Sequence, residues 1–179
     1  PGKPEAPFNY VINATREGAR RALQLLLDRG HRRIMYLRET GKARFLVEQM
    51  DLAVREMEQQ RPDLKLEWVD ISRKCEDLPV ERFRQPLPPT AILSYNYAMA
   101  EEAIGVLAAA GYRVPDNLEV VSCYSFQSEK GWVSTIVVDD FEIGRLAAEA
   151  IQKLIEQPDY RVRLEVPAEL IQRKTTKAQ

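Results

Sequence analysis

The stretch RALQLLLDRGHRRIMYL, from Arg21 to Leu37, contains a helix pattern and a strand pattern joined through one glycine. Apolar residues recur before the glycine at intervals of three and four, which predicts a helix with one buried face. Gly30 is the expected left-handed end of that helix. Ile34 to Leu37 is a short, uninterrupted apolar run, which is typical of a strand buried on both faces. The stretch therefore predicts a helix that is followed directly by a central strand.

The same joint occurs again downstream, where a helix rich in alanine ends at Gly111 and a strand follows at Val120 and Val121. Two such joints indicate a repeated αβ unit, and hence an α/β fold in which helices cover a parallel sheet in αβα layers. Thr15 is the expected N-terminal cap of the first helix. We expect further strands over 8–12, 64–68, 90–94, 135–138, 162–166 and 170–171, and further helices over 44–59 and from 140 to about 154.

The composition excludes several classes of protein. The 26 lysine and arginine residues are balanced by 27 aspartate and glutamate residues, so there is no basic excess for a nucleic acid backbone. No apolar run approaches the roughly 18 residues that a membrane-spanning helix needs. The two cysteines and a start that does not resemble a signal peptide favour a cytoplasmic protein.

Signals for enzyme chemistry are weak throughout the chain. His31 is the only histidine, so a zinc site is not expected, and its place after a helix end indicates a structural corner. Gly41 and Lys42 lack the spacing of a phosphate-binding loop, and no dinucleotide fingerprint follows a strand. Asp139 and Asp140 are expected to cap a helix. We therefore expect neither an enzyme nor a bound cofactor or metal.

With no enzyme indicated, the sequence favours a fold that binds a ligand. In open α/β sheets, ligands bind beyond the carboxyl ends of the strands. The polar residues expected there are Asn13, Ser94 to Tyr97, Tyr124, Ser125 and Asp139. They suit a neutral polar ligand, and for each of them an ordinary loop or capping role is equally compatible with the sequence.

Four motifs in succession point to a known family. They are REGARRALQLLLDRGHRRI, PPTAILSYNYAMAEEAIGVLAAAGYRVPDNLEVVS, STIVVDDFEIGRLAAEAI and VPAELIQRKTT. Together they resemble the LacI/GalR family of bacterial transcription regulators over nearly the whole chain. The resemblance implies an effector-sensing module of periplasmic-binding-protein-like (type I) fold, in which two lobes close on a small molecule. It also implies a homodimer that binds operator DNA only through a helix-turn-helix headpiece, which this sequence does not contain.

The resemblance also implies a division of the chain. Residues 13–138 correspond to the C-terminal lobe, and residues 1–12 to a strand entering from the N-terminal lobe, most of which is missing. Residues 139–160 correspond to a helix that belongs to the N-terminal lobe. Residues 161–179 correspond to a return strand and the C-terminal tail.

The ligand-binding positions of the family fall on seven residues, several of them altered. They are Asn13, Arg44, Ile71, Asn96, Tyr97, Tyr124 and Phe141. The family's pocket arginine aligns with Leu46, for which Arg44 is the nearest substitute, and its stacking aromatic aligns with Ile71. Tyr97 and Tyr124 stand where the family has aspartates. We expect an effector that is sugar-like but poorer in hydroxyls than a hexose, or planar and aromatic.

Three other interpretations stay open from the sequence. The altered pocket could bind nothing, leaving a domain that only dimerises. The chain could instead be a sugar-binding protein of an uptake system with the same fold, although secretion would then be expected. An unrelated αβ enzyme of flavodoxin-like topology is opposed by the lack of a cofactor loop.

Overall fold

A computed structural model describes residues 8–39, 44–126 and 131–177 of the chain. The opening stretch forms α1 (Thr15–Asp28) and β2 (Arg33–Glu39), as its pattern predicts. Gly30 has a φ of +87°, and the amides of Gly30 and His31 donate to the carbonyls of Leu27 and Leu26. A residue with a side chain would be strained at this φ, so the glycine allows the tight turn between helix and strand.

The main sheet has six strands in the order β3-β2-β4-β5-β6-β8. Its other strands are β3 (Lys65–Ile71), β4 (Ala91–Ser94), β5 (Glu119–Phe126), β6 (Ser134–Val138) and β8 (Glu169–Ile171). All neighbouring pairs are parallel except β6 and β8. The expected α/β fold with a parallel sheet is confirmed, and the half-exposed strand β3 lies at one edge.

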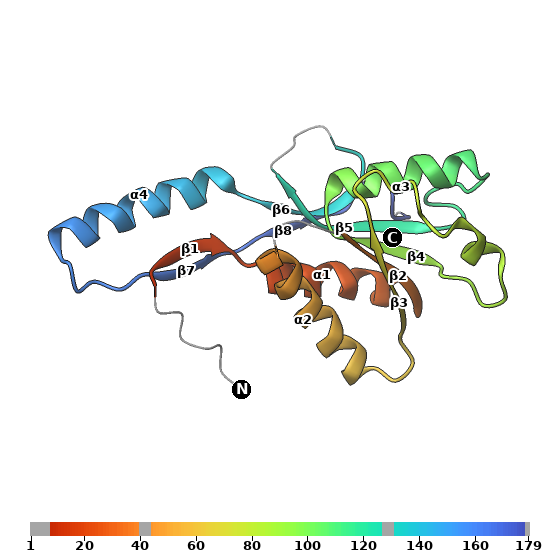
Figure 1. The fold of residues 1–179 in the computed structure, drawn as a ribbon, viewed down its shortest axis with the longest axis horizontal. Helices are drawn as coiled ribbons and strands as arrows, with labels where there is room; N and C mark the ends of the chain where they lie inside the picture. Colours follow the sequence, from red (N-terminus) through yellow and green to blue (C-terminus); the bar gives the residue numbers. More distant parts are fainter. Residues whose placement is uncertain (1–7, 40–43, 127–130, 178–179) are drawn as a thin grey trace.

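Helices cover both faces of this sheet. In Figure 1, α1 and α2 (Arg44–Gln60) lie below the sheet and α3 (Tyr97–Ala109) lies above it. A short 3-10 helix, η1 (Val80–Arg84), precedes β4. The central strands are fully buried by these layers, since Ile34, Met35, Tyr36 and Leu37 each have 0% exposure. This accounts for the uninterrupted apolar run in the sequence.

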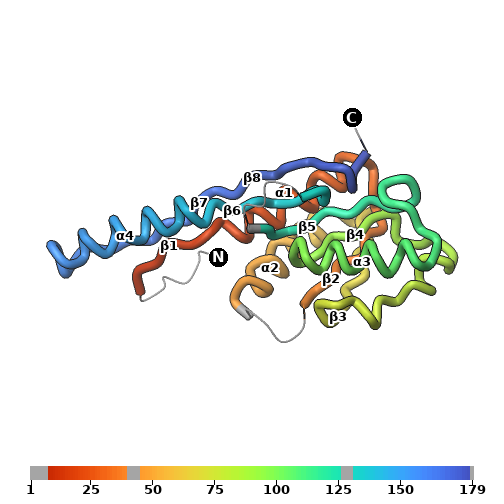
Figure 2. Tube along the Cα trace, turned by 90° about the horizontal axis from the view of Figure 1, so that it is seen from above, coloured from red at the N-terminus to blue at the C-terminus, as the bar shows by residue number. Residues whose placement is uncertain are grey.

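A separate arm, made of β1 (Tyr10–Asn13), β7 (Arg163–Val166) and α4 (Asp140–Glu156), projects from one end of the main sheet (Figure 2). β1 and β7 pair in parallel, and α4 packs on β1. Much of the arm's apolar surface is open, because Phe141 is 80% exposed, Ile155 77% and Ile151 58%. No helix in the described part of the chain is long and apolar enough to cross a membrane.

The predicted role of Thr15 as a helix cap is wrong. Thr15 is already the first residue of α1, and the cap position falls on Ala14, which has no side chain able to accept a hydrogen bond. The hydroxyl of Thr15 instead donates to Oδ1 of Asn13 at 3.1 Å. The reason is that β1 extends to Asn13, which leaves a single residue between strand and helix.

Candidate ligand-binding site

The carboxyl ends of the parallel strands lie at the end of the main sheet next to the arm, where β6 leads into α4 (Figure 1). Polar side chains gather at this end, as is usual for ligand sites in α/β sheets. Four of them form what we call the strand-end cluster. These are Glu39 at the end of β2, Tyr95 and Asn96 after β4, and Tyr124 on β5.

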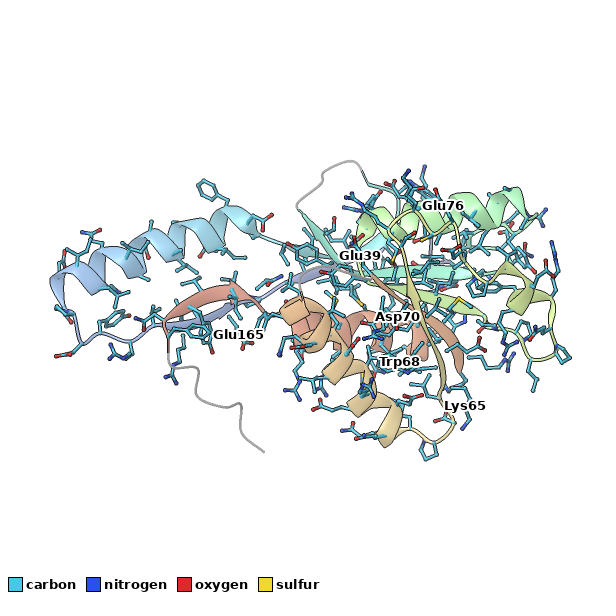
Figure 3. The ribbon with its side chains drawn as sticks, in the orientation of Figure 1. Glu39, Lys65, Trp68, Asp70, Glu76 and Glu165 are labelled. Carbon is cyan, nitrogen blue, oxygen red and sulfur yellow. The ribbon has the colours of Figure 1, made fainter. Side chains whose placement is uncertain are left out.

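Asn96 has two structural contacts. Its Oδ1 accepts a hydrogen bond from the backbone N–H of Met99 at 2.8 Å, which caps α3. Its Nδ2 donates to Oε2 of Glu39, also at 2.8 Å. Figure 3 labels Glu39 between α3 and the sheet. Because the cap fixes the amide, Asn96 ties the start of α3 to the end of β2.

Two tyrosines extend the strand-end cluster across the sheet. Burial raises the pKa of Tyr95, and the nearby Glu39 carboxylate adds to the effect. Burial also raises the pKa of Tyr124, with further contributions from Asp140 and Tyr95. Both phenols are therefore neutral hydrogen-bonding groups at neutral pH, and Tyr95 lies close enough to Tyr124 to affect its ionisation.

A β-bulge accompanies Tyr124. The register between β5 and β6 shifts between Ser122 and Ser125. The hydroxyl of Ser122 lies 2.8 Å from that of Thr135 and 2.9 Å from the carbonyl of Tyr124. Bulges next to binding sites commonly redirect a side chain, and this one lies directly at Tyr124.

Tyr97 is directed elsewhere. Its hydroxyl accepts a hydrogen bond from the backbone N–H of Trp132 at 3.0 Å. The indole N–H of Trp132 in turn donates to Glu101 on α3 at 2.9 Å. These contacts hold the chain before β6 against the start of α3.

The remaining predicted site residues are more dispersed. Asn13 ends β1 and accepts the hydrogen bond from Thr15. Ile71 ends β3 and is 2% exposed, within the apolar core, whereas Phe141 is 80% exposed on the arm. Arg44 begins α2, but its side chain lies outside the described part of the structure. The structure thus brings Asn96 and Tyr124 together with Tyr95 and Glu39.

Glu39 was not expected at the site from the sequence, and Tyr95 was expected there only as part of the segment from Ser94 to Tyr97. Glu39 is 8% exposed, and such deep burial is unusual for a carboxylate. Tyr95 is 5% exposed. The available signal was position, because both residues directly follow the buried apolar runs of β2 and β4. A charged residue after an apolar run is more often a strand end that faces solvent, so the pattern alone favoured the wrong environment.

The opposite end of the sheet holds His31 in the predicted corner between α1 and β2. Its Nδ1 lies 2.9 Å from the hydroxyl of Thr90 and its Nε2 lies 3.4 Å from the carboxylate of Glu119. Burial lowers the pKa of His31, although Glu119 acts in the opposite direction. Arg29 donates two hydrogen bonds to the same carboxylate. These contacts are structural and lie at the amino ends of the strands.

The described residues form no group that could hold a metal ion. In the ranges 8–39, 44–126 and 131–177, no three histidine, cysteine, aspartate or glutamate side chains are placed to share a metal ion. Cys75 and Cys123 are buried free thiols.

Comparison with known proteins identifies relatives. The family of periplasmic binding protein-like domains matches residues 23–176. The HTH-type transcriptional repressor PurR of Mannheimia succiniciproducens is 27% identical over 183 residues, covering 94% of this chain and 53% of the repressor. The chain therefore spans about half the length of this curated relative.

Solved structures give the same picture of the fold. A LacI family transcriptional regulator from Bifidobacterium animalis subsp. lactis superposes with a TM-score of 0.80 at 22% identity, covering 95% of this chain and 64% of the regulator. The Lac repressor dimer bound to operator and the anti-inducer ONPF superposes with a TM-score of 0.81 at 20% identity, covering 97% of this chain and 63% of the repressor. These relatives are transcriptional regulators and not enzymes, in agreement with the expectation from the sequence.

Proposed function

Since this chain belongs to the periplasmic binding protein-like domain family, in the form of the effector-binding domain of LacI-type regulators, we propose that it senses a small molecule on behalf of a transcription regulator. The effector binds at the strand-end cluster, between the main sheet and a second lobe to which the arm belongs. Operator DNA is bound by a helix-turn-helix headpiece outside this sequence. The protein works in the cytoplasm, as a regulator of transcription does.

The observation that carries the proposal is the gathering of Glu39, Asn96 and Tyr124 at the carboxyl ends of the strands, next to the arm. Ligands of open α/β sheets bind at this end because loops there diverge and leave room for polar contacts. Two hydrogen bonds fix the side chain of Asn96, and the bulge fixes the position of Tyr124. The polar groups are thus oriented before a ligand arrives. Fixed groups lower the entropy cost of binding.

We divide the chain into lobes as the sequence suggests. Residues 13–138 form the C-terminal lobe, residues 1–12 and 139–160 belong to the N-terminal lobe, and residues 161–179 are the return strand and the C-terminal tail. The parallel pairing of β1 with β7 and the packing of α4 on β1 support this division. The exposed Phe141, Ile151 and Ile155 are then surfaces that the rest of the N-terminal lobe covers.

Self-association through α3 is part of the proposal. The exposed side of α3 carries Glu101, Glu102 and Gly105, and Trp132 lies against it with 37% exposure. Aromatic residues are enriched in protein interfaces, whereas glutamates are depleted there. The hydrogen bond from Trp132 to Glu101 supplies a partner for a carboxylate that would otherwise be costly to bury.

A thermal-shift screen against sugars, nucleobases and aromatic acids tests the proposed site. A ligand at a hundred times its dissociation constant adds about 2.7 kcal/mol to the free energy of unfolding, which is visible as a raised midpoint. We expect Tyr124→Ala to abolish the shift. The matched control is Tyr160→Ala, which removes the same side chain beyond α4. A shift that survives Tyr124→Ala unchanged contradicts the proposed site.

The second candidate function is a sugar-binding protein of an uptake system. It shares the fold, and it differs in requiring export and a partner in a membrane. The 27% identity to a transcriptional repressor over nearly the whole chain favours the regulator.

A further inference from the structure

The carboxylate of Glu39 is buried, and no side chain that the structure describes provides it with a cation. The residue is 8% exposed, and its Oε2 accepts a hydrogen bond from Nδ2 of Asn96 at 2.8 Å. Among the side chains that the structure describes, no lysine or arginine forms an ion pair with it. A carboxylate has about four acceptor positions, so one amide donor leaves most of its capacity unused.

The nearest arginine in sequence is occupied elsewhere. Arg38 donates to Asp51 at 2.8 Å and to Asp70 at 2.7 Å, so two carboxylates already neutralise its charge. Consecutive residues of a strand point to opposite faces of the sheet, and Arg38 contacts α2 while Glu39 contacts the start of α3. Arg38 is thus directed away from Glu39.

The described neighbours of Glu39 on its own face are neutral or acidic. Burial raises the pKa of Cys75 to about 11, with Glu102 and Glu39 contributing, so its thiol is uncharged at neutral pH. Tyr95 is likewise a neutral phenol, because burial and then Glu39 raise its pKa. The described side chains around Glu39 therefore supply hydrogen bonds and apolar surface, and none of them carries a positive charge.

We propose that Glu39 determines the specificity of the strand-end cluster, and that the effector carries a cationic nitrogen, of the ammonium or amidinium class, which binds this carboxylate. The inference rests on the proposed function and adds the charge of the ligand to it. Asn96 holds the carboxylate in place, and the phenols of Tyr95 and Tyr124 surround the nitrogen.

The physical reason is the cost of burying a charge. A buried carboxylate without a cation loses hydration that one hydrogen bond does not replace, and a bound cation offsets that loss. Hydrogen bonds between charged partners are about twice as strong as neutral ones. Aromatic rings beside the site add attraction for a cation.

Calorimetric titration of the chain with two isosteric probes tests the proposal. Benzamidine is a planar amidinium cation at neutral pH, and benzamide has nearly the same shape without the charge. We expect benzamidine to bind tighter than benzamide by about tenfold or more. Equal affinity of the two probes, or tighter binding of benzamide, overturns the inference without using any variant.

Two substitutions locate the effect. Glu39→Gln keeps an oxygen that accepts from Asn96 but removes the charge, and we expect it to abolish the preference for benzamidine. Asp63→Asn removes the same charge from an exposed residue before β3, at the amino end of the strands, and we expect it to leave the preference intact. A preference that survives Glu39→Gln overturns the assignment to Glu39.

The result also separates this inference from the proposed function. Neutral sugars that bind the chain and lose affinity in Tyr124→Ala, with no preference between the two probes, overturn the role of Glu39 and leave the site standing. If neither probe nor any ligand of the screen binds, both are overturned.

Discussion

Arg29 and Glu119 form a buried ion pair that joins the end of α1 to the start of β5. Nε of Arg29 lies 2.5 Å from Oε2 of Glu119 and Nη2 lies 3.1 Å from Oε1. The side chains are 9% and 4% exposed. Nη2 of Arg29 also donates to the carbonyl of Lys177 at 2.6 Å, so the pair holds the C-terminal segment against the sheet.

Removing one partner of this pair should be strongly destabilising. We expect Arg29→Met to lower the free energy of unfolding by about 3–5 kcal/mol, because Glu119 is left buried without its arginine. The control is Arg145→Met, which breaks an exposed pair with Glu142 on α4 and should cost less than about 1 kcal/mol. Urea denaturation measures both. Similar losses in the two variants would contradict the structural role of the pair.

Stability should fall as the pH falls below neutral, because of His31. Burial, the largest cause, lowers the pKa of His31 in the folded state below its usual 6.5, so the unfolded chain binds the proton more readily. The stabilisation from neutral His31 is present above pH 6.5 and is lost as the pH falls toward the lowered folded pKa. Because this is the only histidine, one imidazole signal in an NMR titration gives its pKa directly.

His31→Asn provides the control for that titration. It should remove the dependence of the unfolding free energy on pH between about pH 5 and 7, where histidine titrates.

Glu119 acts at lower pH: its burial raises the pKa, but hydrogen bonds from Arg29 and from the Lys177 amide outweigh this and lower it. The stabilisation from ionised Glu119 is therefore lost as the pH falls below 4.5, toward its lowered folded pKa, in both proteins. An imidazole pKa above 6.5 would refute the assignment for His31.

Asn96→Ala should cost more than the loss of an ordinary helix cap. A cap is worth about 1 kcal/mol, and this substitution also removes the donor to the buried Glu39. Asp139→Ala is the comparison, since Asp139 caps α4 through the N–H of Glu142. We expect Asn96→Ala to be the more destabilising of the two by about 1 kcal/mol or more in chemical denaturation. Equal costs would indicate that the contact with Glu39 contributes nothing to stability.

Gly105→Arg should weaken self-association without harming the fold. A Cβ at Gly105 would meet no atom within 4 Å, and arginine is a better helix former than glycine. The added side chain blocks the exposed side of α3, so we expect a lower mass by light scattering at micromolar concentration. Gln59→Arg, on the exposed surface of α2, adds the same charge and should leave the mass unchanged. A monomeric parent chain would overturn the proposed interface.

The fold could be predicted from the sequence because its determinants are local. Each of these patterns indicates the structure of its own segment: the apolar run of β2, the left-handed Gly30 and Gly111, and the alternation in β3. The predicted cap at Thr15 failed because the exact end of β1, one residue away, depends on pairing with β7 across more than a hundred residues of chain.

The candidate site could be predicted only in part. Its position followed from the rule for parallel sheets, and Asn96 and Tyr124 lie where expected. Glu39 was not predicted as a site residue, because its burial arises from the start of α3 and the segment around Cys75, which are distant in sequence. A sequence pattern reports a residue's neighbours along the chain, whereas the environment of Glu39 is made by elements that only folding brings together.

In the part of the chain that the structure describes, three passages cross between the main sheet and the arm: Asn13 to Thr15, Val138 to Asp140, and Val166 to Glu169. Each has one or two residues between regular elements, too few to let the two parts slide or separate. Their relative motion is therefore restricted to a change of angle about these short crossings. A ligand that binds more tightly at one angle than at another shifts the two parts toward that angle.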